Sequence, residues 1–65
     1  MTTHFDYQAA TLEELADYVE ISTSARISQQ IIYYTRKNVP EMVQKIRDAR
    51  KIVKKRKMIR ALEAM

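Results

Sequence analysis

The sequence predicts an all-α fold of three helices in one small domain, and three observations lead to this prediction. The 65 residues include no glycine and one proline, so the residue that tight hairpin turns need is absent. Apolar residues recur at helical spacing in three separate segments. Each segment follows a residue type that commonly caps helices, namely Thr, Ser or Asn.

The first helix is predicted over residues 12–21. Thr11 and Glu14 have the spacing of a capping box, in which each side chain accepts a hydrogen bond from the other residue's backbone amide. The apolar positions that follow lie on one helical face, and acidic residues occupy the opposite face. These apolar positions are Leu12, Leu15, Ala16 and Val19.

The second helix is predicted over residues 24–37, after a break of three hydroxyl residues that can cap it. Its apolar residues, Ile27, Ile31 and Tyr34, recur at positions i, i+4 and i+7. The helix is expected to end near Arg36 and Lys37, because cations suit a helix C-terminus.

The third helix is predicted over residues 39–64. Asn38 is expected to be its N-cap, with Glu41 as the capping-box partner and Pro40 in the first turn, where a missing amide is tolerated. The first apolar stripe of this helix consists of Met42, Ile46, Ala49 and Val53. The basic residues expected to face away from it are Arg47, Arg50, Lys51, Lys54 and Lys55.

A second apolar stripe, comprising Met58, Leu62 and Met65, is rotated from the first by well over a quarter turn. One straight helix lying on one surface cannot bury both stripes. Three interpretations remain open: the helix bends near residue 56, its last turns contact another partner such as a second subunit, or the end is a frayed, solvated tail.

Residues 1–10 are expected to form a short extended arm ahead of a helix-turn-helix candidate (residues 11–38) and a basic C-terminal helix (residues 39–65). His4 to Gln8 alternate polar and apolar residues, as a strand does. This segment either pairs with the same segment of another chain, or Phe5 and Tyr7 anchor the arm onto the helices.

Small domains often need a disulfide, a metal or a partner chain. With no cysteine and one histidine, a disulfide is excluded and we expect no metal or other cofactor. We therefore expect a homodimer whose subunits contact each other through Met58, Leu62 and Met65.

Charge is divided along the chain. All twelve Lys and Arg residues lie after residue 25, whereas five of the eight acidic residues precede it, so residues 1–25 carry −5 and residues 26–65 carry +9. The basic part can contact a polyanion such as DNA. Alternatively, the acidic segment can pair with a basic segment within the chain or across a dimer.

The stretch from Thr11 to Ser22 resembles the opening of bacterial helix-turn-helix repressors. In that family an alanine lets the two helices approach closely and a Val or Ile closes the turn; Ala16 and Ile21 match these places. The family usually has glycine where Glu20 stands, and its next core aliphatic residue comes one position before Ile27.

The resemblance implies double-stranded DNA as the partner, with the second helix as the recognition helix. Its expected base-reading and phosphate-contacting residues are Arg26, Ser28, Gln29, Gln30, Tyr33 and Arg36. The third helix is expected to add phosphate contacts through Arg47, Arg50, Lys51, Lys54 and Lys55. A transcriptional regulator of this kind is expected in the cytoplasm, associated with the nucleoid.

Ribbon-helix-helix repressors offer a second resemblance, because they place a short alternating strand before two helices and fold as dimers. Here the strand would present His4, Asp6 and Gln8 to the DNA, and Asp6 would meet a negative surface. The other alternative is a small all-helical interaction module, an adaptor or inhibitor that docks its basic third helix on an acidic protein partner.

We expect no enzymatic activity, because the sequence shows no nucleophile, acid or base held beside a second catalytic group. The longest apolar runs are far shorter than a membrane span, so we expect no membrane insertion and a soluble cytoplasmic protein.

Overall fold

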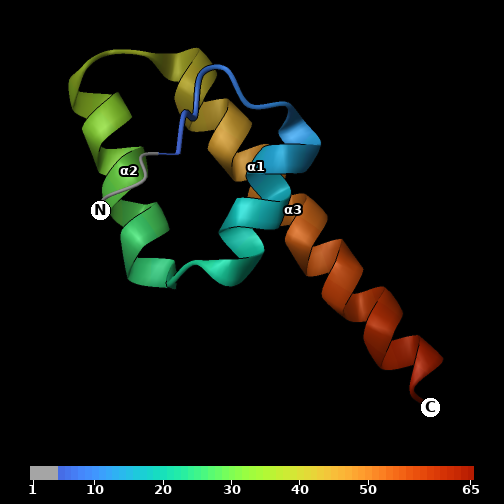
Figure 1. Ribbon diagram of the computed structural model, residues 1–65. Coiled ribbons are helices and arrows are strands. Elements are labelled where there is room, and N and C mark those ends of the chain that lie inside the picture. The colour runs from blue at the N-terminus through green and yellow to red at the C-terminus, as the bar shows by residue number, and fades with distance from the viewer. Residues whose placement is uncertain (1–4) are drawn as a thin grey trace, which may run out of the picture.

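The computed structural model describes residues 5–65 and contains three helices (Figure 1): α1 (Leu12–Ile21), α2 (Ser24–Arg36) and α3 (Pro40–Glu63). The described part of the chain contains no strand, so the predicted all-α fold is confirmed. Both α1 and α2 pack on α3, which continues past them to the C-terminus (Figure 1). Within residues 5–65, no helix combines the length and apolar character that crossing a bilayer requires.

The hydrophobic core lies where α1 and α2 meet the first half of α3. Leu15 and Ala16 of α1 are completely buried, and so is Ile27 of α2, at 1% exposure. The first apolar stripe of α3 faces them as predicted, with Met42, Ile46, Ala49 and Val53 all buried. The alanine side chains on α1 and α3 leave room for the two helix backbones to approach closely.

The N-termini of α1 and α2 carry the side-chain caps that hydroxyl residues favour. In the capping box of α1, the Glu14 amide donates to Thr11 Oγ1 at 3.1 Å and the Thr11 amide donates to Glu14 Oε1 at 2.8 Å, as predicted. For α2, Thr23 Oγ1 accepts a hydrogen bond from the Arg26 amide at 3.2 Å.

The prediction that Asn38 caps α3 is wrong, because Asn38 ends α2 instead. Its φ is 58°, and its amide donates to the Thr35 carbonyl at 3.1 Å while the Val39 amide donates to the Tyr34 carbonyl at 3.0 Å. This is the pattern of a Schellman motif, whose left-handed position usually takes glycine and sometimes asparagine. The N-cap of α3 is Val39, with no side-chain hydrogen bond, so Glu41 has no capping-box partner.

Over the residues that the structure describes, the N-terminal segment forms a turn rather than the expected extended arm, and it contains no strand. Asp6 Oδ1 accepts hydrogen bonds from the amides of Gln8 and Ala9, at 3.0 and 3.1 Å. His4 lies outside the described residues. The anchoring alternative is confirmed, because Tyr7 is buried in the core and Phe5 stacks on Tyr18 with ring centroids 4.2 Å apart.

Lys45 of α3 holds this segment against the helices through hydrogen bonds. Its Nζ donates to the backbone carbonyls of Tyr7 at 2.9 Å and Gln8 at 3.2 Å, and to that of Ala10. One ammonium group therefore satisfies three carbonyls of a segment that has no regular secondary structure to satisfy them.

The second half of α3 continues as helix to Glu63 without a sharp kink, so the chain is not frayed there (Figure 1). Its second apolar stripe is open to solvent, with Met58, Leu62 and Met65 exposed at 59%, 65% and 98%. The stripe is thus solvated, as the third interpretation expected, and it is accessible to another partner, as the second requires.

Candidate nucleic-acid interface

The acidic residues of α1 are partly neutralised within the chain. Arg56 Nη1 of α3 contacts Asp17 Oδ1 at 2.7 Å and Glu20 Oε2 at 3.3 Å, and Arg60 also binds Glu20. The hydrogen bond from Arg60 is the largest cause that lowers the pKa of Glu20 from its ordinary value. Pairing of the acidic and basic segments within the chain is therefore confirmed at these positions.

The other cations of α3 form a separate basic surface. Over residues 5–65, the salt bridges found all involve Arg56 or Arg60, on the side of α3 that faces α1. The cations on the outward side are exposed and take no part in these pairs; those predicted to contact phosphate are Arg47, Lys51, Lys54 and Lys55. Positive charge is thus concentrated on the side of the molecule that α1 does not cover.

The outward face of α2 brings together three of the predicted recognition residues. Gln29, Tyr33 and Arg36 are exposed, and with Ile32 and Lys37 they line a shallow, open cavity of about 620 Å³. Lys37 Nζ lies 5.7 Å from the centre of the Tyr33 ring, a cation–π distance. Arginine and glutamine offer paired polar groups that suit base edges, and a tyrosine hydroxyl can reach a phosphate.

Ser28 and Arg50 hold α2 against α3 instead of facing solvent freely. Arg50 Nη2 donates to Ser28 Oγ at 3.0 Å and to the Ser24 carbonyl at 3.3 Å. Both side chains are half-buried. The prediction placed Ser28 on the solvent side of α2, whereas the structure turns it toward α3.

Arg26 lies on yet another side of α2, near Tyr7 of the N-terminal segment, and Gln30 follows it by four residues on the same helical face. A hydrogen bond from Arg26 is the largest cause that lowers the pKa of Tyr18. The positive charge of Arg26 also acts to lower the pKa of Tyr7, against the larger effect of burial. Gln30 is half-buried. The six residues predicted on α2 are therefore divided among three sides, because α3 and the N-terminal segment both pack against this helix.

An aromatic cluster lies behind Arg26. The Tyr7 ring contacts those of Phe5, Tyr18 and Tyr34 edge-on, with centroids 5.2, 5.7 and 6.2 Å apart. Burial raises the pKa of Tyr7 well above its usual range. The sequence predicted, as one alternative, that Phe5 and Tyr7 anchor the arm on the helices, but their contacts with Tyr18 and Tyr34 could not be read from local spacing.

The turn between α1 and α2 departs from what the helix-turn-helix resemblance implies. Ala16 is completely buried, as its place in the motif requires, but Ile21 is 84% exposed and does not close the turn. Instead, the Ser22 hydroxyl donates to the Tyr18 carbonyl at 2.7 Å and the Ser22 amide donates to the Val19 carbonyl at 3.2 Å.

Lys57 is a cation that the sequence reasoning left out of the candidate site. It lines a pocket together with Arg50 and Lys54, at the turn between α1 and α2. Lys57 lies within the basic run that follows Val53. The sequence did not indicate that it lines a pocket, because the pocket forms only where α1 and α2 pack beside α3.

The part of the chain that the structure describes contains no group of three or more His, Cys, Asp or Glu side chains placed to hold a metal ion. Comparisons with protein-family models, curated proteins and solved structures found no match to this chain. The candidate interface therefore rests on the exposed residues of α2 and on the cations along α3 that form no salt bridge within residues 5–65.

Proposed function

We propose that this protein binds double-stranded DNA through the outward faces of α2 and α3, as a small transcriptional regulator does. The observation that carries the proposal is the separation of charge. Arg56 and Arg60 are occupied by the acids of α1, while the outward cations of α3 are left for an external anion. A polyanion such as DNA is the partner that such a surface favours.

Within this proposal the two helices have different tasks. Gln29 and Arg36 on α2 read base edges, because their side chains can form paired hydrogen bonds with a base. Arg47, Lys51 and Lys54 on α3 contact the phosphate backbone and fix the register of the protein on the duplex. The role is binding rather than catalysis.

Two substitutions separate these tasks. Arg36→Ala should lower the preference for the best site over a scrambled duplex by about 1–3 kcal/mol, because a base contact is lost. Lys54→Ala should weaken binding to both duplexes alike and reduce the salt slope by about 1. Fluorescence anisotropy with a site selected from random duplexes measures both quantities.

Equal losses for the two variants on both duplexes would contradict the division between reading and positioning. Absence of duplex binding by the unchanged protein would favour the other role for the same basic face of α3, docking on an acidic protein surface.

We also propose that two copies pair through the exposed stripe of Met58, Leu62 and Met65. Met58 and Leu62 stand two residues before and two residues after position 60, and Ile59 between them is 46% exposed. Antiparallel pairing centred at the level of position 60 therefore places Met58 of one copy opposite Leu62 of the other, and Lys57 at the same level as Glu63. A second copy thus supplies an apolar surface that matches this stripe.

Sedimentation velocity at micromolar concentration tests this pairing. The unchanged protein should sediment as a dimer, and Leu62→Glu should sediment as a monomer with unchanged helix content. Ile21→Glu is the matched control, because Ile21 is 84% exposed but lies outside the stripe, and this variant should remain dimeric. A folded monomeric wild type would refute the pairing.

A further inference from the structure

A pocket of about 320 Å³ lies where the turn between α1 and α2 meets α3. Apolar side chains from all three helices, Val19, Ile27 and Val53, form part of its wall. The polar residues that line it are Glu20, Ser22, Ser24, Arg50, Lys54 and Lys57. The pocket is therefore lined by both apolar and polar side chains.

The net charge around the pocket is positive. Arg50, Lys54 and Lys57 line it, and Glu20 is the one acid among the lining residues. Glu20 is bound by Arg56 and Arg60, so its charge is already compensated from outside the pocket. The three lining cations are left without an equal negative charge, which favours an anion in this position.

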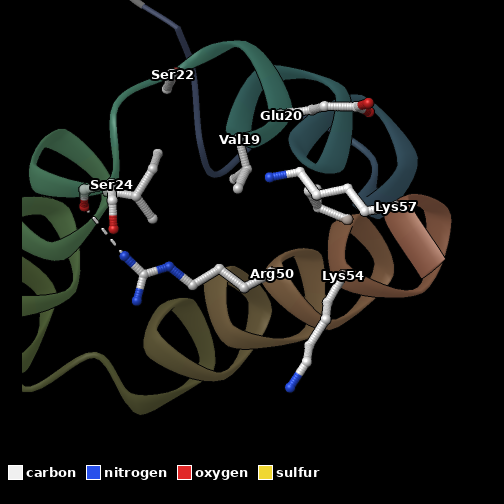
Figure 2. Close-up of a pocket in the computed structure, with 9 residues that line it drawn as sticks. Val19, Glu20, Ser22, Ser24, Arg50, Lys54 and Lys57 are labelled. Atoms are coloured by element: carbon white, nitrogen blue, oxygen red, sulfur yellow. Dashed lines mark hydrogen bonds between the residues drawn. The ribbon is translucent and has the colours of Figure 1, made fainter. Parts of the chain in front are cut away.

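The donors are arranged on two sides of the space (Figure 2). Arg50 reaches toward Ser24, to which it is hydrogen-bonded, while Lys57 reaches across from the other side toward Val19. Both hydrogen bonds of Arg50 come from Nη2, and a guanidinium has five N–H donors. Lys54 extends away from the pocket at its edge (Figure 2).

We infer that this pocket receives a phosphate group of the DNA backbone. The inference rests on the proposed DNA binding. A phosphate accepts several charge-assisted hydrogen bonds at once. The Nη1 donors of Arg50, whose hydrogen bonds to α2 come from Nη2, and the Lys57 ammonium group on the other side can supply them. The outward amine of Lys54 would then hold the next stretch of backbone, so that the pocket fixes α2 in register along the duplex.

Proton–nitrogen NMR of the labelled full chain tests the inference with a short GC-rich duplex. The duplex should shift the amides of Ser22 and Ser24, and Lys57→Gln should remove these shifts and lower the salt slope of binding by about 1. Lys37→Gln is the matched control: it removes an equal charge just after α2, outside the pocket, and should retain the Ser22 and Ser24 shifts.

A titration with inorganic phosphate against chloride at equal ionic strength separates the source of the anion. If the unchanged protein binds the duplex but Lys57→Gln keeps the shifts and slope, the pocket inference is overturned and the DNA proposal stands. If the duplex does not bind, the DNA proposal fails; phosphate-induced shifts at Ser22 and Ser24 would then show a site for free phosphate, which overturns a backbone contact.

Discussion

Lys45 connects two segments that are far apart in the sequence. It reaches from the middle of α3 to the carbonyls of Tyr7, Gln8 and Ala10 and so closes the N-terminal segment over the core. The sequence offered no sign of this contact, because a lysine on an amphipathic helix is ordinarily solvated. By contrast, the hydrogen bonds between Thr11 and Glu14 were predictable, since a capping box depends only on local spacing.

Replacement of Lys45 by methionine should lower the free energy of unfolding by about 1–3 kcal/mol, the cost of losing hydrogen bonds to a charged group. The methionine keeps the aliphatic contact but leaves the carbonyls without a donor. Urea unfolding followed by circular dichroism measures the change. Lys51→Met, which removes an exposed cation two turns from Lys45, should change stability by less than about 0.5 kcal/mol. Equal effects of the two substitutions would contradict the role of Lys45.

At the scale of elements, α3 is the support on which the other helices pack. Its first stripe and the approximate bounds of all three helices were predictable from apolar spacing, because that spacing depends on helical geometry alone. The outward face of α2 was not predictable in the same way, since it depends on α3 binding Ser28 and on the N-terminal segment lying beside Arg26. Asn38 was misassigned because asparagine suits both the end of one helix and the start of the next.

The contrast between Ile46 and Ile21 tests this packing. Ile46 is completely buried on α3, so Ile46→Ala should cost about 2–5 kcal/mol, enough to unfold much of so small a domain. Ile21 ends α1 and is 84% exposed, so Ile21→Ala should stay within about 0.5 kcal/mol of the unchanged protein. Thermal and urea unfolding give both values. A large loss of stability in Ile21→Ala would contradict this packing and support the role in closing the turn that the helix-turn-helix resemblance gives Ile21.

At the scale of the whole molecule, charge is sorted in space as well as along the chain. The net charge of +4 combines an acidic α1, bound to Arg56 and Arg60, with a basic outward surface on α2 and α3. The division was predictable from the sequence by counting. The sequence did not show which cations remain available to an external anion, because that depends on α1 lying beside the later part of α3.

The affinity of the unchanged protein for duplex DNA, measured by anisotropy from low to moderate salt, tests DNA binding most directly. We predict binding at low salt, with the logarithm of the association constant falling linearly against the logarithm of salt concentration. Its slope should be about −0.9 for each phosphate contacted. Absence of binding even at low salt, or an affinity that does not change with salt, would contradict a basic surface that binds DNA through its phosphates.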